Sequence, residues 1–306
     1  MISLGIDTSN YTTSAALYDS ERKAMISKRR LLKVKQGELG LRQSEAVFQH
    51  TVSLPEIIKE VFSETKSIPE TVAVSVSPCD FEGSYMPCFM CGKGVAESIA
   101  SAAKIPVKFF SHQAGHIAAV IYSSGNFELL SKEFLAFHIS GGTTEAVLVK
   151  PDKKRIFVTQ KKAGSLDLKA GQAIDRVGKM IGLSFPAGAG LDALSRKSEK
   201  TFKIKPSIKD GCCSLSGLQN RCENMLKNGE APEDIAKYCI DYISRALEEM
   251  TDALLLSYKD MPVVFSGGVT GNSLIRERFI KKYGAVFASS GLSSDNAAGL
   301  AFLGTL

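Results

Sequence analysis

The chain has 306 residues, of which 44% are hydrophobic, and its formal net charge is +6. This size is ample for a buried core and predicts two domains. No apolar run approaches the ~20 residues that cross a bilayer, and we expect no secretory signal. Seven cysteines, an odd number, predict reduced thiols in a cytoplasmic protein with no membrane partner.

The first residues predict a β-hairpin. Residues 2–6 form an apolar strand, residues 7–10 form a polar turn, and residues 15–18 form the exit strand. Residues 22–34 predict a third strand with a basic outer face. Its cationic side chains indicate either an edge strand protected by charge or a patch for a phosphate backbone; they are Lys28, Arg29, Arg30, Lys33 and Lys35.

A helix with a kink at Pro55 is expected over residues 43–64, followed by a buried strand over residues 71–76. The next segment becomes a helix near Cys88. Cys88 and Cys91 form a CxxC motif with Cys79 upstream, but a fourth ligand at zinc-finger spacing is absent. We favour buried structural thiols over a metal or redox site.

A strand over residues 105–110 leads into Ser111, a plausible helix N-cap. His112 and His116 follow at a spacing of four and therefore share one helix face. Two imidazoles so placed are either ligands for Zn²⁺ or Fe²⁺ or ordinary hydrogen-bonded side chains. Gln113 stands where a zinc protease carries its glutamate, so a metalloprotease mechanism lacks its base.

A second hairpin opens the other half of the chain. Residues 134–139 enter the turn Ser140-Gly141-Gly142, and residues 146–149 leave it. Successive amides at such a turn can form an anion-binding nest. A Thr-Thr pair follows this turn as it follows the turn of the first hairpin, which suggests a duplicated architecture.

The second half continues with strands, helices and two further glycine-rich turns. The helix over residues 168–183 is expected to be capped by Asp167, and residues 195–209 to form an exposed basic loop. The strand over residues 262–265, the turn at residues 266–272 and the helix beginning near Ser273 suggest a nucleotide-binding arrangement. The other expected elements are a strand at 153–162, helices at 191–196, 232–258 and 297–303, and a strand at 285–288.

The order of elements in each half predicts an α/β protein, with a mixed sheet flanked by helices built twice. This is the duplicated, actin-like ATPase layout, with lobes expected at residues 1–125 and 126–306.

Eight motifs in this order resemble the tRNA threonylcarbamoyladenosine transferases of the TsaD type, once labelled M22 glycoproteases. The resemblance runs over residues 2–303. The family patterns and their positions here are GI(E/D)TS at 5–9, HxEGH at 112–116, VSGGHT at 139–144, DDAAGEAFDK at 167–176, YPGG at 185–188, FSFSGLKT at 213–220, AGGVxAN at 266–272 and TDN at 294–296.

The resemblance implies a metal- and nucleotide-dependent transferase that places a threonylcarbamoyl group on N6 of the adenosine beside the anticodon. His112, His116 and Asp295 would hold Fe²⁺ or Zn²⁺ at the catalytic centre; from its position alone, Asp295 would be a helix cap. ATP, ADP or threonylcarbamoyl-adenylate would be bound, with Mg²⁺ a further candidate. The implied nucleotide-site residues are Asp7, Ser9, Thr13, Ser140, Gly141, Gly142, Thr143, Asp167, Gly171, Asp175, Gly188, Gly267, Gly268 and Asn272.

The implied partners are tRNA, other tRNA-modification proteins and a second subunit, as a homodimer or heterodimer through the N-terminal lobe. The chain departs from the family pattern at polar positions, which are Tyr11, Thr12, Ala114, Thr143 and Gln172. The alternative hypothesis is therefore a catalytically altered paralogue that binds nucleotide and metal for assembly or regulation, or that carbamoylates another acceptor.

Overall fold

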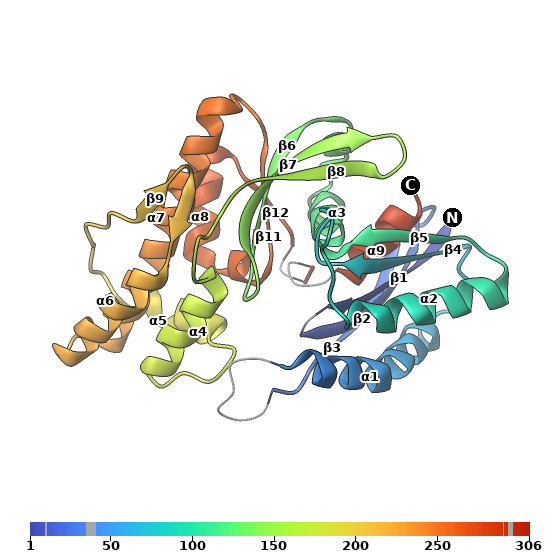
Figure 1. The fold of residues 1–306 in the computed structure, drawn as a ribbon, viewed down its shortest axis with the longest axis horizontal. Coiled ribbons are helices and arrows are strands. Elements are labelled where there is room, and N and C mark those ends of the chain that lie inside the picture. The colour runs from blue at the N-terminus through green and yellow to red at the C-terminus, as the bar shows by residue number, and fades with distance from the viewer. Residues whose placement is uncertain (10, 35–40, 290, 293–295) are drawn as a thin grey trace. The chain divides into compact units, whose positions relative to one another are not determined.

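The structure is a computed structural model that describes residues 1–9, 11–34, 41–289, 291–292 and 296–306. The chain forms two compact units (Figure 1). Unit 1 comprises Met1–Lys132, Pro151–Thr159 and Ser294–Leu306, and unit 2 comprises Glu133–Lys150 and Gln160–Ser293. The predicted lobe boundary between residues 125 and 126 stays a prediction.

Unit 1 is built on a five-stranded mixed sheet with the order β3-β2-β1-β4-β5. The first three strands are antiparallel, whereas β4 and β5 run parallel to β1. Helices α1 and α2 cover one face, and α3 and α9 cover the other (Figure 1). The elements are β1 (Ile2–Ser9), β2 (Thr12–Asp19), β3 (Ala24–Leu31), α1 (Gln43–Ser63), β4 (Thr71–Ser77), α2 (Phe89–Ala103), β5 (Val107–Ser111), α3 (His112–Ser124), η1 (Phe127–Ser131) and α9 (Ala297–Gly304).

Unit 2 repeats this topology. Its main sheet has the order β12-β11-β6-β7-β8, so β6, β7, β8, β11 and β12 correspond to β1, β2, β3, β4 and β5. The elements are β6 (Phe134–Ile139), β7 (Thr144–Asp152), β8 (Ile156–Gly164), α4 (Ala170–Met180), α5 (Gly188–Ser195), β9 (Ser207–Lys209), β10 (Cys212–Ser214), α6 (Ser216–Lys227), α7 (Pro232–Ser257), β11 (Val263–Ser266), η2 (Gly268–Gly271), α8 (Ser273–Tyr283) and β12 (Val286–Phe287). The predicted duplicated α/β fold is confirmed.

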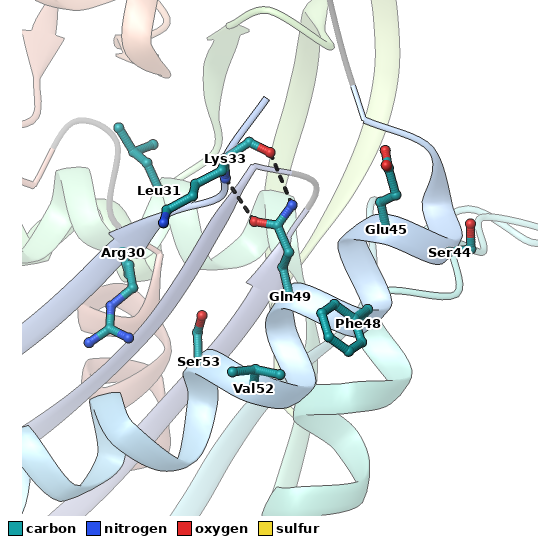
Figure 2. Close-up of a pocket in the computed structure, with 9 residues that line it drawn as sticks. All are labelled: Arg30, Leu31, Lys33, Ser44, Glu45, Phe48, Gln49, Val52 and Ser53. Atoms are coloured by element: carbon teal, nitrogen blue, oxygen red, sulfur yellow. Dashed lines mark hydrogen bonds between the residues drawn. The ribbon is translucent and has the colours of Figure 1, made fainter. Parts of the chain in front are cut away.

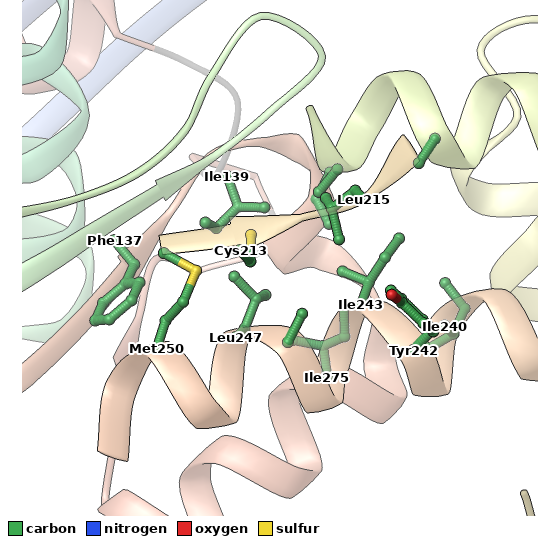
Figure 3. Packing of buried hydrophobic residues seen from close by; sticks show 14 of the residues in the cluster. Phe137, Ile139, Cys213, Leu215, Ile240, Tyr242, Ile243, Leu247, Met250 and Ile275 are labelled. Carbon is green, nitrogen blue, oxygen red and sulfur yellow. The ribbon is translucent and has the colours of Figure 1, made fainter. Parts of the chain in front are cut away.

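The core of unit 2 lies between this sheet and the long helix α7. Phe137 and Ile139 of β6 meet Leu247 and Met250 of α7 in one buried cluster (Figure 3). All six residues of β6 are buried. A strand covered on both faces reads as a continuous apolar run, which is why residues 134–139 carry no polar alternation.

Three details of the sequence prediction were wrong. Asp7 and Ser9 do not form the first turn, because β1 runs to Ser9 and pairs with β2 over its whole length. Asp167 does not cap the helix at 168, because α4 begins at Ala170 and its N-cap is Lys169. The loop over residues 195–209 was expected to be irregular, yet its end forms β9, which pairs with β10.

Two cations of β3 form ion pairs with carboxylates on or just after α1. Lys28 pairs with Glu64, and Arg30 pairs with Glu56 and Glu60 of α1. β3 is the edge strand of its sheet, which confirms the edge-strand prediction, and the patch for a phosphate backbone stays a prediction. Lys35 lies outside the described residues. None of the helices that the structure describes is both long and apolar enough to span a bilayer.

Candidate functional site

Unit 2 contains a cavity of about 770 Å³. Its wall combines the β6–β7 turn, the start of α4, helix α5, and the segment from η2 into α8. The lining residues are Gly141, Gly171, Ile174, Asp175, Pro186, Gly188, Ala189, Asp192, Ala193, Arg196, Gly268, Val269, Gly271, Asn272 and Ser273. This volume lies within the ~300–1,000 Å³ range of ligand pockets.

The β6–β7 turn is closed by its own hydrogen bonds. The Ser140 amide donates to the Thr143 carbonyl at 2.7 Å, and the Thr143 amide donates to Ser140 Oγ at 3.1 Å. Helix α4 then packs directly on this turn. The Gly171 amide donates to the Ser140 carbonyl at 3.1 Å. A Cβ atom on Gly171 would lie 2.6 Å from the Gly141 nitrogen, so only glycine permits this approach.

Asp175 lies on the cavity side of α4. Its carboxylate accepts a hydrogen bond of 2.8 Å from the Ala187 amide, in the loop before Gly188. Burial raises the pKa of Asp175 despite this bond. A raised pKa indicates a desolvated carboxyl group with an unmet need for polar partners, as expected where a ligand donates hydrogen bonds.

Asn272 lies at the junction between η2 and α8. Its side-chain oxygen accepts from the Ile275 amide at 3.1 Å, so Asn272 caps α8. Its amide nitrogen donates to Asp192 Oδ1 at 3.0 Å. The α8 N-terminus and the η2 backbone therefore face the cavity, and a helix N-terminus favours an anion or a polar ligand edge.

Asp192 is a site residue that the sequence reasoning missed. Its carboxylate accepts from the Asn272 amide, from the Ser273 amide at 3.3 Å and from Ser273 Oγ at 2.8 Å. It thereby joins α5 to the start of α8. The available signal was its spacing, because Asp192 follows Gly188 by four residues and lies on the same helix face.

The structure distributes the predicted nucleotide residues other than Asp167 among three places. The residues that line the cavity are Gly141, Gly171, Asp175, Gly188, Gly268 and Asn272. Those adjacent in sequence to lining residues, or in the same turn, are Ser140, Gly142, Thr143 and Gly267. Asp7, Ser9 and Thr13 belong to unit 1.

Asp167 serves the framework of unit 2. Its carboxylate accepts from the Leu215 amide at 2.7 Å and from Ser216 Oγ at 2.7 Å, which fixes the junction between β10 and α6. Gln172 also has a local contact, since its side-chain oxygen accepts from the Lys169 amide at 3.3 Å at the start of α4. Thr144, the second threonine of its pair, accepts from the Ala170 amide at 2.8 Å.

His112 and His116 meet at the start of α3 in unit 1. Ser111 caps this helix as predicted, accepting from the Ala114 amide at 3.1 Å. The rings of His112 and His116 lie 4.7 Å apart between centroids. His116 is buried, whereas His112 is partly exposed.

Asp7 lies against this histidine pair. Its Oδ1 is 3.1 Å from His112 Nδ1 and also accepts from Ser75 Oγ. Burial would raise the pKa of Asp7. His112 and the hydroxyls of Ser75 and Ser9 outweigh this effect and hold the pKa below its usual value. Asp7 is thus a buried, ionised carboxylate, which orients the imidazole it touches.

Asn296, at the start of α9, completes the described surroundings of the histidines. Its Nδ2 lies 3.0 Å from His112 Nε2, and its buried Oδ1 has no hydrogen-bond partner among the described residues. The predicted third ligand, Asp295, lies outside the described residues but adjoins Asn296 in sequence. Imidazole nitrogens and an amide oxygen are donor types that a divalent metal accepts, so the chemistry of these side chains fits a metal ion.

No group of three or more His, Cys, Asp or Glu side chains within the described ranges is arranged to hold a metal. The CxxC motif was the other candidate for a metal or redox site. Cys88 is fully buried, and this burial raises the pKa of its thiol to about 12. Such a thiol is inert at neutral pH, which agrees with the structural interpretation of the CxxC motif.

Two units with the same five-stranded mixed sheet, each flanked by helices, define the duplicated actin-like fold. A dehydratase activator from Clostridium difficile with bound ADPNP has a TM-score of 0.57 at 14% identity, covering 99% of this chain and 94% of that one. HypF from T. kodakarensis has a TM-score of 0.66 at 12% identity, covering 99% of this chain and 47% of that one. At these identities the likeness concerns the fold alone.

Residues 27–302 match the TsaD family, described as tRNA N6-adenosine threonylcarbamoyltransferase. A curated relative of that name from Persephonella marina is 30% identical over 322 aligned residues, covering 98% of this chain and 88% of the relative. The chain therefore belongs to the TsaD family of transferases.

Proposed function

We propose that this chain transfers a threonylcarbamoyl group to N6 of adenosine in tRNA and that the unit 2 cavity binds the adenylate part of the donor. The observation that supports the cavity assignment is the convergence of Gly141, Asp175 and Asn272, from three separate segments, on one wall. Asp175 would accept from ribose hydroxyls, and Asn272, held by Asp192, would donate the second hydrogen of its side-chain amide to the ligand.

The glycine segments would bind the phosphate. The amides near Gly141 and Gly268 carry no side chain that would hold a ligand away from the backbone. The N-terminus of α8 adds a favourable dipole for negative charge.

We assign the metal site to His112 and His116, with Asp295 as the third ligand and Fe²⁺ or Zn²⁺ as the ion. When bound, the metal would supply a Lewis acid for the carbamoyl carbonyl or hold the adenylate phosphate. Asp7 would keep the His112 ring oriented through the 3.1 Å contact between Asp7 Oδ1 and His112 Nδ1. Mg²⁺ on the nucleotide phosphates and a cytoplasmic location complete the proposal.

Assembly through the N-terminal lobe has a candidate surface in unit 1. A groove of about 690 Å³ lies between β3 and α1 (Figure 2). Leu31, Phe48 and Val52 line it and are 66%, 69% and 53% exposed. The Gln49 side chain bonds both backbone groups of Lys33, at 2.8 and 3.0 Å, and covers the strand edge there. An exposed apolar groove suits a second subunit or another tRNA-modification protein.

The second candidate function is an altered paralogue that keeps nucleotide and metal binding without this reaction, or with another acceptor. The observation that favours it is Gln172, which stands where the family pattern carries a glutamate and so brings no negative charge to the start of α4. Thr143 likewise takes the place of a histidine in the turn beside the cavity.

One experiment separates the two functions. The purified chain is incubated with threonylcarbamoyl-adenylate and a tRNA transcript, with and without companion tRNA-modification proteins, and the nucleosides are analysed by mass spectrometry. We expect modified adenosine, lost in the His112→Ala and Asp175→Asn variants. Nucleotide and metal binding without modified adenosine would reject the transfer reaction and leave the altered paralogue. Full activity in His112→Ala would reject the metal assignment.

A further inference from the structure

The segment 202–209, which precedes the β9–β10 turn, alternates strictly between exposed and covered residues. Phe202, Ile204, Pro206 and Ile208 are buried or partly buried. Lys203, Lys205, Ser207 and Lys209 are exposed. The three lysines therefore project from one face of an extended segment, and we call them the lysine row.

The covered side of this segment is anchored on the core of unit 2. Phe202, Ile204 and Ile208 pack against the main hydrophobic cluster. The Phe202 ring contacts Tyr238 of α7 edge to face, with centroids 5.2 Å apart. The last three residues form β9, which lies beside α7 and pairs with β10 (Figure 1). The backbone that carries the lysine row is thus fixed before any partner binds.

No carboxylate of the described residues neutralises the charge of the lysine row. Within the described ranges, Lys203, Lys205 and Lys209 form no ion pair. By contrast, Lys200 pairs with Glu230 and Asp234. Lys28 and Arg30 of β3 are likewise paired, with Glu64 and Glu60.

The spacing of the lysine row suits a polyanion with regular charge. In an extended chain, residues two apart are separated by about 6.6 Å and residues four apart by about 13 Å. Lys203 and Lys205 therefore match one step between successive phosphates of a nucleic-acid strand, and Lys205 and Lys209 match two. A fixed backbone also lowers the entropy cost of aligning several cations with several phosphates.

We infer that the lysine row is a binding site for the sugar–phosphate backbone of RNA and positions the tRNA acceptor on unit 2. The inference rests on the proposed function for the choice of tRNA, while the geometry of the site is independent of it. Each lysine that contacts a phosphate displaces condensed counterions, so the affinity depends on salt. Lysine contacts of this kind carry no base specificity.

The test is a salt titration of tRNA-transcript binding to the full chain, measured by fluorescence anisotropy. In the variant Lys203→Gln, Lys205→Gln, Lys209→Gln, the slope of log K against log salt should fall in magnitude by about 2 to 3, at roughly 0.7–0.9 per lost phosphate contact. A scrambled RNA of equal length should show the same loss.

The matched control removes three ion-paired lysines by Lys28→Gln, Lys200→Gln and Lys282→Gln, which changes the net charge equally. Its slope should stay near that of the wild type. Melting curves of both variants verify that they are folded.

An unchanged slope in the lysine-row variant, or an equal loss in the control, overturns the inference. It is also overturned if the wild type fails to bind the transcript at low salt, or if the variant loses binding only to phosphatidylserine vesicles. Turnover is measured separately. If the wild type binds RNA but modifies no adenosine, the proposed reaction is rejected. If the wild type modifies adenosine but the lysine-row variant keeps the wild-type salt slope, the RNA site at the lysine row is rejected.

Discussion

Asp192 joins two parts of the cavity wall that are far apart in the chain. Its carboxylate binds the Asn272 amide at 3.0 Å and the Ser273 hydroxyl at 2.8 Å. Asn272 in turn caps α8 at Ile275. One carboxylate therefore orients both the side chain and the helix terminus that we assign to the nucleotide.

The variant Asp192→Asn should weaken adenine-nucleotide binding by about 10- to 100-fold. Its amide nitrogen would face the Asn272 and Ser273 donors, and hydrogen bonds to a charged group are worth ~1.5–3 kcal/mol. Isothermal titration calorimetry of the full chain measures this. Asp210→Asn, in the exposed β9–β10 turn, is the control and should bind as the wild type does. Equal affinities in both variants would contradict the role of Asp192.

At the scale of elements, helix α4 is held beside the cavity by hydrogen bonds at its first turn and at its second. Its first amides bind Thr144 Oγ1 and the Ser140 carbonyl. One turn later, Asp175 binds the loop that leads into α5. The position of α4 therefore depends on a carboxyl group whose pKa is raised by burial.

This pKa gives a signed prediction for stability. Because the native state holds the Asp175 proton to higher pH than the unfolded chain does, the native state binds more protons between the two pKa values. The free energy of unfolding of the wild type therefore decreases as pH rises through that window. The variant Asp175→Asn lacks this titration. Its free energy of unfolding should therefore increase relative to that of the wild type as pH rises above the usual aspartate pKa. Urea unfolding across pH measures the difference.

The control for that series has the opposite sign. The amides of Arg155 and Lys154 lower the pKa of Asp152, which is partly exposed at the end of β7. A lowered pKa contributes stability that is lost as pH falls. The free energy of unfolding of Asp152→Asn should therefore decrease relative to that of the wild type as pH rises out of the acid range. If both variants give the same sign, the assignment of the Asp175 shift is wrong.

At the scale of the whole molecule, the last described helix is part of the first unit. Helix α9 packs on β1, β2 and β4 and against α3, the helix that carries His112 and His116. The approach of α9 to α3 is close. A Cβ atom on Gly299 would lie 1.9 Å from the Gly115 carbonyl oxygen and 2.7 Å from the Ala119 nitrogen.

The variant Gly299→Ala should therefore destabilise unit 1 by about 1–3 kcal/mol, because neither backbone can yield without unpacking α9. It should also reduce bound metal, since α3 would shift. Gly94→Ala is the matched control, as its Cβ would meet nothing within 4 Å on the surface of α2. Guanidinium unfolding and metal analysis are the measurements, and an unchanged unfolding midpoint would contradict the close packing.

Much of the fold followed from local pattern. Residues 134–139 and residues 71–76 are apolar runs bounded by turns, and both are buried strands. The apolar stripe over residues 232–258 is the long helix α7. Hydrophobic periodicity is a property of a short window, so it can be recognised without knowing the partner that covers it. The order of the motifs likewise identified the family.

The sequence by itself determined the two similar sheets, the family, and the glycine turns beside the cavity. The tertiary structure decided which side chains share a wall: Asp192 joins Asn272 across 80 residues, and Asp167 serves the start of α6 rather than α4. It also decided that α9 closes unit 1. The physical reason is that a carboxylate or a helix face has many acceptable partners in sequence, and only the folded backbone brings one of them within hydrogen-bonding or packing distance.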